Sequence, residues 1–396
     1  MKDLRILHIP NECTGCGACA NRCPKTVIAI KQNEEGFYYP VVDETRCVEC
    51  GLCEKTCHIL NPIEDTKGSA LFFMYRTNDE NLLQESSSGG AFTLFANYFL
   101  SESGVVYGST YDGLSERLRV ISTDQVDLSA LRKSKYIESY TGHSFTEIKN
   151  HLMNGRKVLY CGTPCQVSGL KHYLKSTKTP IDCLLTIDFA CHGVPSNGLF
   201  NMFKSMLESP KRRLVAVDFR HKDFSSVGKG WHNPIIKFFF SDGTTKEINR
   251  NSYYYYFYRL FSDDLSLRKC CYSCNRLLSS QADISIGDFW GLGSYKPELD
   301  DNKGMSYVKV NNDSILPLWE ELSSSGYVER LPIEAVSYQY KERIKDDALK
   351  KRNAFSVSLQ RKGLFKTIIS YYGINEMFRT IVLSKLKHKV INSIKR

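Results

Sequence analysis

The segment ECTGCGACANRCP (residues 12–24) carries four cysteines in a run that returns 34 residues later as CVECGLCEKTC (residues 47–57). At this spacing, three thiolates can wrap around one cubane cluster while the fourth reaches across to a second cubane. The spacing therefore predicts two [4Fe-4S] clusters with crossed ligand sets. The predicted sets are Cys13, Cys16, Cys19 and Cys57 for the first cluster, and Cys47, Cys50, Cys53 and Cys23 for the second.

Structural zinc is the alternative use of these eight cysteines. Zinc sites are typically built from two separated C-x2-C pairs, whereas this chain uses a C-x2-C-x2-C-x3-C run twice. Between the runs, residues 26–47 predict two short strands around a Glu-Gly turn. The region resembles a bacterial two-cluster ferredoxin, with one departure at His58, where a second proline often follows the last cysteine.

The composition of the whole chain is that of a globular protein. It has 396 residues, of which 42% are hydrophobic and 24% are charged, so we expect two or three domains with a real core. No apolar run approaches the roughly 20 residues that span a bilayer, and the first residues lack the apolar segment of a secretory signal. We therefore expect a soluble cytoplasmic protein whose 15 cysteines serve metals or catalysis rather than disulfides.

The net charge of +10 is concentrated at the end of the chain. Residues 341–396 hold 15 Lys and Arg against 4 Asp and Glu, so the rest of the chain is close to neutral. We expect these residues to be helical, with apolar positions at Leu364, Ile368, Ile369, Tyr372 and Ile374, and then at Phe378, Ile381, Val382 and Leu386. Three interpretations compete: the segment docks an acidic ferredoxin, lies on an anionic membrane, or packs as a solvated helical pair. No nucleic-acid-binding motif is present, so no nucleic-acid partner is expected.

From about residue 70, strand and helix patterns alternate, which indicates an α/β or α+β fold. The predicted strands are Val158–Tyr160, Leu184–Phe189, Leu214–Phe219, Ile235–Phe240, Asp283–Ile286 and Tyr307–Val310. The predicted helices are Ala91–Ser101, Phe145–Asn154, Val167–Lys175, Ser196–Leu207 and Ile315–Ser323. Ser144 and Glu147 form a capping-box pattern at the start of the second of these helices.

Four of the remaining cysteines could hold a third cluster. Cys165 and Cys191 each follow a predicted strand, where loops that carry ligands commonly converge, and Cys271 and Cys274 form a C-x2-C pair. Spacing alone leaves this cluster open. Cys183 lies inside an apolar strand and is typical of a small buried hydrophobic residue.

Eight segments in this region carry a resemblance through their order along the chain. They are SSSGGAF (86–92), SKY (134–136), GTPCQVSGLK (162–171), CHGVPS (191–196), DFRHKD (218–223), LRKCCYSC (267–274), ADISIGDFWG (282–291) and GMSYV (304–308). Together they resemble the coenzyme F420 hydrogenase/dehydrogenase beta-subunit family over about residues 70–330. Members of that family bind FAD and a nearby [4Fe-4S] cluster. The resemblance implies Cys165, Cys191, Cys271 and Cys274 as ligands and leaves Cys270 out.

The resemblance also implies residues that bind the flavin or move protons. A glycine-rich segment before a helix suits a pyrophosphate, although without the family a serine-rich loop with a helix cap would be favoured. The implied flavin-binding residues are Ser88, Gly89, Gly90, Lys135, Gly162, Thr163 and Pro164. His192 and Asp288 are candidate catalytic residues that handle protons during hydride transfer; a structural histidine and a helix cap are the alternatives.

These features predict three domains: a two-cluster ferredoxin domain at residues 1–66, an α/β domain with FAD and an iron–sulfur cluster at residues 67–335, and a basic helical tail at residues 336–396. The predicted function is that of an iron–sulfur flavoprotein oxidoreductase linking a ferredoxin or another electron carrier to a small-molecule substrate. Two alternatives remain: a subunit that oxidises a reduced coenzyme such as F420 for a larger complex, and a scaffold that retains its clusters for structure. The residues leave the substrate and the direction of electron flow open.

Overall fold

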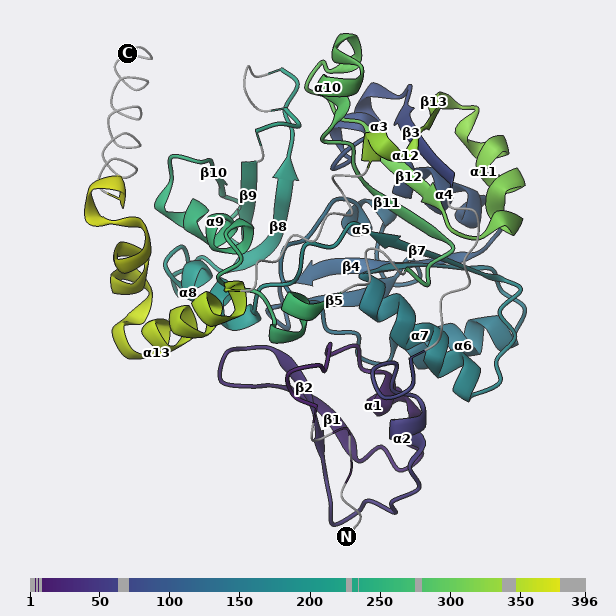
Figure 1. Cartoon of the computed structure of the whole chain (residues 1–396), viewed down its shortest axis with the longest axis horizontal. Helices are drawn as coiled ribbons and strands as arrows, with labels where there is room; N and C mark the ends of the chain where they lie inside the picture. Colours follow the sequence, from purple (N-terminus) through teal and green to yellow (C-terminus); the bar gives the residue numbers. More distant parts are fainter. Residues whose placement is uncertain are drawn as a thin grey trace.

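The structure, a computed structural model, describes residues 4, 6, 9–62, 71–225, 230–233, 235–274, 280–336 and 347–377. Its N-terminal part, purple in Figure 1, contains one antiparallel hairpin and two short helices. These elements are α1 (Ala18–Arg22), β1 (Ile28–Gln32), β2 (Tyr38–Val42) and α2 (Leu52–Lys55). Ile28 pairs with Val42 and Gln32 pairs with Tyr38, which confirms the two predicted strands around the Glu-Gly turn.

The main body is built on an eight-stranded mixed sheet with the order β13-β3-β12-β11-β7-β6-β4-β5. The strands are β3 (Leu71–Thr77), β4 (Val105–Asp112), β5 (Arg117–Ser122), β6 (Val158–Gly162), β7 (Leu184–Phe189), β11 (Ile284–Asp288), β12 (Ser306–Val310) and β13 (Gly326–Leu331). The central strands β4, β6, β7 and β11 are parallel to their neighbours in that group, and the outer strands pair antiparallel. The mixed α/β class predicted from the sequence is confirmed.

Helices cover both faces of this sheet, because neighbouring residues on its buried strands point to opposite sides. On one face, Tyr107 and Tyr160 pack against α6 (Ser144–Met153) and α7 (Pro164–Ser176). On the other face, Val106 and Leu159 pack against α4 (Ala91–Ser101) and Trp319 of α11 (Leu316–Ser323). Figure 1 shows the N-terminal part beneath α6 and α7.

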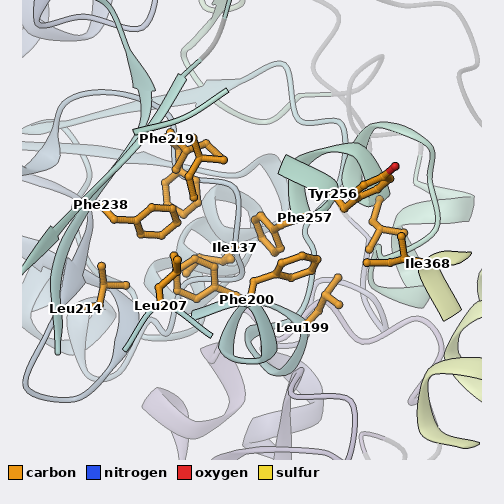
Figure 2. Packing of buried hydrophobic residues seen from close by; sticks show 14 of the residues in the cluster. Ile137, Leu199, Phe200, Leu207, Leu214, Phe219, Phe238, Tyr256, Phe257 and Ile368 are labelled. Carbon is orange, nitrogen blue, oxygen red and sulfur yellow. The ribbon is translucent and has the colours of Figure 1, made fainter. Parts of the chain in front are cut away.

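A second, three-stranded antiparallel sheet stands beside the first. It consists of β8 (Leu214–His221), β9 (Ile235–Phe240) and β10 (Thr245–Ile248) and packs against α8 (Asn197–Ser205) and α9 (Tyr256–Ser262). Figure 2 shows the aromatic core between them, in which Phe200, Phe219, Phe238 and Phe257 lie together. Tyr256 is buried in this core, and Tyr253, Tyr254 and Tyr255 pack against it.

The long helix α13 (Ala348–Tyr372) completes this aromatic core from outside. Gly363 interrupts the helix with φ 74° and ψ 170°, and Gly373 ends it with φ 81°. Ile368 is fully buried, and Leu364, Ile369 and Tyr372 pack partly against the same cluster, whereas Ile374 is exposed. The predicted apolar positions Phe378, Ile381, Val382 and Leu386 lie outside the described residues. None of the described helices combines the length and the hydrophobicity that a membrane crossing requires.

Short helices complete the described part of the chain. They are α3 (Glu80–Gln84), α5 (Leu128–Leu131), α10 (Leu292–Tyr295), α12 (Ile333–Val336) and the 3-10 helices η2 (Tyr253–Tyr255), η3 (Lys269–Ser273), η4 (Pro297–Leu299) and η5 (Asp313–Ile315). The predicted capping box at Ser144 is wrong, because α6 begins one residue earlier, at an N-cap His143 that makes no side-chain cap. A capping box does form at Thr163 and Gln166, which start α7.

Candidate functional site

The first four predicted cluster ligands lie together in the N-terminal part. Burial raises the pKa of the Cys16 thiol to about 12, and the neighbouring Cys57 and Cys13 thiolates add to this rise. Burial also raises the pKa of Cys19, again with contributions from the Cys16, Cys13 and Cys57 thiolates. Cys57 thus lies beside the first run although it belongs to the second, which agrees with the crossed ligand set.

The other four predicted ligands, Cys23, Cys47, Cys50 and Cys53, line a second, smaller cavity of about 20 Å³. Cys50 is exposed and Cys53 is buried, so this group reaches the surface on one side. Four thiols around one void suit an iron–sulfur cubane, whose iron atoms prefer thiolate ligands. Among the described residues, no three His, Cys, Asp or Glu side chains are grouped as ligands of a single metal ion would be.

The first cysteine group faces the main body through α7. A Cβ atom at Gly169 of α7 would lie 2.8 Å from the Cys16 Sγ atom, so only glycine allows this close approach. The Cys165 thiolate, in the first turn of the same helix, also contributes to the raised pKa of Cys16. The predicted third group therefore borders the first.

The third group gathers from three separate loops. Burial raises the pKa of the Cys191 thiol, and the Cys165 and Cys274 thiolates contribute to the same rise. A Cβ atom at Gly193 would lie 3.3 Å from the Cβ atom of Cys271. The donor set is therefore four thiols brought together by the fold, which fits a [4Fe-4S] cluster held by Cys165, Cys191, Cys271 and Cys274.

A cavity of about 390 Å³ lies next to this third group. Its wall combines segments from across the chain: the first ligand loop at Thr14 and Gly15, the start of α4, residues 131–139, Cys165 and Cys191, and β11 with Trp290. Most of the predicted cofactor and catalytic residues line it, namely Ser88, Gly90, Lys135, Gly162, Thr163, His192 and Asp288. Gly89 and Pro164 are not among its lining residues.

The serine–glycine segment meets the cavity at the N-terminus of α4. Gly90 is the N-cap, with φ 94°, and Ala91, Phe92 and Thr93 of the first turn line the cavity. Gly89 has another role, because a Cβ atom there would lie 2.0 Å from the Tyr75 carbonyl oxygen of β3. Helix N-terminal amides beside a cavity are suited to phosphate groups.

Lys135 also lines the cavity. Its Nζ atom donates to the carbonyl oxygens of Leu131 and Arg132 at the end of α5. Burial lowers the pKa of Lys135 to about 7, and the nearby Asp218 carboxylate opposes this effect. A phosphate group in the cavity would favour the charged form of this lysine.

His192 forms a pair with a carboxylate at the cavity wall. Its Nε2 atom lies 2.8 Å from the Oδ1 atom of Asp264, and its ring contacts the edge of Phe261 with a centroid distance of 5.0 Å. A carboxylate beside one ring nitrogen helps to fix the orientation of the imidazole. This geometry suits proton handling, and the sequence did not single out Asp264 as the partner.

Asp288 is engaged by two donors. Arg220 donates from Nη2 at 3.2 Å, and Trp231 donates from Nε1 at 2.5 Å, both to Oδ1. Arg220 is buried, and its pKa is raised by the Asp288 carboxylate despite the opposing effect of burial. The side chain of Trp231 also stacks on Trp290, with a centroid distance of 4.8 Å and an angle of 4°. Asp288 thus holds a cation and an aromatic pair at the cavity wall.

Arg220 is a candidate cofactor residue that sequence reasoning missed. Besides Asp288, its guanidinium contacts the Ser87 carbonyl oxygen at 3.4 Å and the Tyr136 hydroxyl at 3.3 Å. Its segment, DFRHKD, contributed only to the resemblance. A buried arginine beside a serine–glycine turn is a signal for an anion site. The sequence of the strand alone, however, does not show that Arg220 is buried or that it lies beside this turn.

The comparisons with known proteins agree with this geometry. Residues 155–336 match the family model for the C-terminal part of the coenzyme F420 hydrogenase/dehydrogenase beta subunit, and residues 12–59 match that of a 4Fe-4S dicluster domain. The DNA-directed RNA polymerase subunit Rpo3 of Methanosarcina acetivorans is 38% identical over 58 residues, which are 15% of this chain and 21% of that relative. The chain thus spans about a fifth of that relative's length.

Among solved structures, a chain of the F420-reducing [NiFe] hydrogenase complex from Methanosarcina barkeri, a xenon derivative, aligns with 79% of this chain and 97% of its own length. The sequence identity is 18% and the TM-score is 0.45. The two family matches, one in each part of the molecule, confirm the resemblance predicted from the ordered motifs. Residues 155–336 are thus similar to the C-terminal part of the coenzyme F420 hydrogenase/dehydrogenase beta subunit, and residues 12–59 are similar to a 4Fe-4S dicluster domain.

Proposed function

We propose that this protein is an iron–sulfur flavoprotein oxidoreductase that carries electrons between a ferredoxin-type donor, three [4Fe-4S] clusters, FAD and an organic substrate. The observation that carries the proposal is the cavity of about 390 Å³, whose wall joins the ferredoxin-like loop at Gly15, the ligands Cys165 and Cys191, and the start of α4. One wall thus brings a predicted cluster within reach of a predicted flavin site. The predicted domains at 1–66, 67–335 and 336–396 are part of this proposal.

In this proposal the cavity holds FAD, with its phosphates toward the first turn of α4. Ser87, Ser88 and Gly90 border that turn, and Lys135 and Arg220 supply positive charge from elsewhere on the wall. When bound, FAD supplies the ability to combine single electrons into a two-electron reduction. Gly162 and Thr163 line the cavity, and Thr163 and Pro164 also start α7 and so hold Cys165.

The cysteine groups suggest an order for the electron path. The group with Cys50 reaches the surface, the group with Cys16 borders α7, and the group with Cys165 lines the cavity. Electrons from a carrier would enter at the exposed group and reach the cavity through the other two. The same path serves electrons that leave the cavity.

Within the cavity we assign different roles to the two candidate catalytic residues. His192, paired with Asp264, is the group that donates or accepts a proton beside the reacting atoms. Asp288 is bound by Arg220 and Trp231, so we propose that it positions the cationic wall. Trp290, stacked on Trp231 and partly exposed, offers a ring surface to a planar cofactor or substrate.

The cofactor content tests the proposal directly. Anaerobically reconstituted protein should hold about twelve iron atoms, as expected for three four-iron clusters, and about one FAD released on denaturation. Cys165→Ser should lower the iron content to about eight. Cys183→Ser is the matched control, because Cys183 packs against the hydrophobic core and should leave the iron unchanged. Wild-type protein with about eight iron atoms would remove the third cluster from the proposal.

The flavin site needs a variant that does not strain the backbone. A side chain at Gly90 would be strained at φ 94°, so Ser87, whose Oγ accepts from the Ser134 amide at 2.7 Å, is the better position. Ser87→Asp places a carboxylate near the proposed phosphates and should weaken FAD binding on the order of ten-fold. Ser87→Asn has a similar shape without the charge and should bind FAD nearly as wild type. Equal FAD affinity in the two variants would place the phosphates elsewhere.

A second candidate function is that of a subunit which oxidises a reduced coenzyme and passes electrons to a larger complex. The matching family model, which describes a beta subunit, favours it. Cys16→Ala separates the candidates. In a stand-alone reductase, flavin reduction by reduced ferredoxin should slow strongly, while dithionite still reduces the flavin. In a coenzyme-oxidising subunit, reduced F420 should still bleach the flavin of this variant, while onward transfer fails. In a cluster scaffold, loss of the ligand should unfold the chain, because metal ligation contributes folding free energy.

A further inference from the structure

Arg268 is a buried arginine that joins the main body to the ferredoxin-like part. Its Nε atom donates to the Cys13 carbonyl oxygen at 2.7 Å, and its Nη2 atom donates to the Tyr38 carbonyl oxygen at 2.9 Å. Its Nη1 atom donates to the Oε1 atom of Glu138 at 2.5 Å. One guanidinium therefore satisfies three acceptors on three separate segments, which only the planar fork of arginine can do.

Glu138 holds this arginine in place. The side chains of Arg268 and Glu138 belong to residues that are 1% and 4% exposed, respectively, and the other carboxylate oxygen of Glu138 accepts from the Tyr38 amide at 2.9 Å. The Glu138 carboxylate raises the pKa of Arg268 against the effect of burial, so the arginine carries its charge throughout the accessible pH range. Removal of one partner would leave an uncompensated buried charge, which is strongly unfavourable.

The position of Arg268 in the chain connects two predicted ligand loops. It directly precedes the 3-10 helix η3 (Lys269–Ser273), which carries Cys271 and leads to Cys274. Through the Cys13 carbonyl oxygen it also binds the loop of the first cysteine group. Gly15 of that loop packs on the ion pair so closely that a Cβ atom there would lie 2.7 Å from the Glu138 carboxylate.

We propose that Arg268, held by Glu138, is a positioning residue that fixes the distance between the ligand loops of the first and third clusters. This inference rests on the proposed function. The transfer concerned moves one electron, with the first cluster oxidised and the third reduced, and its rate depends steeply on how the two sites are placed. Electron transfer between two sites slows when their separation or relative orientation departs from the native arrangement, so residues that hold the ligand loops in place influence its rate.

A second buried arginine makes a similar connection and provides a matched control. Arg352 of α13 donates from Nε to the Leu267 carbonyl oxygen at 3.0 Å and from Nη2 to Glu35 at 2.8 Å. It therefore also joins the β1–β2 turn to the main body, and it is similarly buried. Neither of these two bonds reaches the ligand loop of the first cysteine group. Arg352 therefore joins the ferredoxin-like part to the main body, as Arg268 does, but does not contact a ligand loop of the first cluster.

The experiment compares Arg268→Lys, Glu138→Gln and Arg352→Lys in the reconstituted full chain. The first two variants should retain wild-type iron, yet their magnetic coupling between the reduced first and third clusters, measured by electron paramagnetic resonance, should weaken. Their transfer from the ferredoxin-like part to the flavin should slow on the order of ten-fold. Arg352→Lys should lose thermal stability to a similar degree but keep both the coupling and the transfer rate.

Two outcomes overturn the inference. In one, Arg268→Lys and Arg352→Lys change the coupling and the transfer rate equally. Both arginines would then only attach the ferredoxin-like part to the main body. In the other, both Arg268→Lys and Glu138→Gln lose iron, which would assign the pair to folding rather than positioning. Absence of the third cluster from wild-type protein would instead refute the proposed function, and the iron assay detects that separately.

Discussion

Lys135 illustrates how a single buried charge makes the stability of this protein depend on pH. The pKa of Lys135 is lowered by burial to about 7, well below the ordinary value of a lysine near 10.5. Between pH 7 and about 10 the unfolded chain therefore binds more protons than the folded chain, and the free energy of unfolding rises with pH in that window. Below pH 7 the full cost of the buried charge remains.

This lysine gives a prediction for the apoprotein. From pH 6.5 to pH 9, the free energy of unfolding of the wild type should rise by on the order of 2 kcal/mol more than that of Lys135→Met, which has nothing to titrate at this position. Loss of the bonds to the Leu131 and Arg132 carbonyl oxygens should lower the stability of the variant equally at each pH. Urea unfolding at several pH values measures both effects. Lys175→Met on the exposed surface of α7 is the control and should follow the wild type; parallel pH profiles for Lys135→Met would contradict the prediction.

At the level of residues, cysteine spacing predicted more of the candidate site than any other signal. The two runs with a fixed step brought Cys57 to the first group, as the spacing required. The partners of the other candidates were hidden, because Asp264 lies 72 positions from His192 in sequence and Arg220 lies 68 from Asp288. Such pairs come together only through tertiary packing, and contacts between residues so far apart produce no local pattern in a single sequence.

At the level of elements, the role of α13 follows from its buried face. Ile368 is 0% exposed and packs in the aromatic core shown in Figure 2, whereas Ile374, just beyond the helix, is 51% exposed. Ile368→Ala should lower the free energy of unfolding by about 2–4 kcal/mol, because it removes buried methyl groups and leaves a cavity.

Ile374→Ala is the matched control for this core position and should change the stability by less than about 0.5 kcal/mol. Chemical denaturation of the apoprotein distinguishes the two. If both substitutions had the same small effect, α13 would not contribute to the core. The result would bear on the basic segment as a whole, since the packed part of α13 favours the interpretation as a solvated helix over a free docking arm.

The elements that the sequence predicted well have strong local signals. Parallel strands such as β6 and β7 are short, mostly apolar segments, and both were predicted at nearly the bounds that the structure gives. The sequence missed β3, β4, β5, β10 and β13. Of these, β5 and β13 lie at the two edges of the main sheet and mix charged with apolar residues, which weakens their strand signal. The capping box at Thr163 and Gln166 was not predicted, although Thr-x-x-Gln is its usual sequence pattern.

At the level of the whole molecule, the proposed function makes the exposed cysteine group the contact point for an electron carrier. Val48, beside Cys47, is 56% exposed and borders the small cavity of this group. Val48→Asp should lower kcat/KM for a protein electron donor on the order of ten-fold, because it replaces an exposed apolar side chain beside the proposed entry group with a charge. Reduction by dithionite should stay at the wild-type rate, since a small reductant needs no docking surface.

Val328→Asp, on the exposed edge strand β13, is the control for this prediction and should leave donor kinetics unchanged. Stopped-flow spectra of flavin reduction record both rates. A wild-type response of Val48→Asp to the protein donor would show that electrons enter elsewhere, for example directly at the cavity.

The order of strands in the main sheet also determines how long β3 waits for its neighbours during synthesis of the chain. Strand β3 leaves the ribosome early, yet its two neighbours, β12 and β13, begin at Ser306 and Gly326. At roughly 5–20 residues per second, synthesis takes on the order of 10 to 50 seconds to supply those partners. During that interval the apolar strand Leu71–Thr77 has neither edge paired, while the preceding cysteine-rich part is already complete and able to take up iron. Because unpaired apolar strands are prone to aggregate, a chaperone that binds extended apolar segments would find a target at β3 until β12 is synthesised.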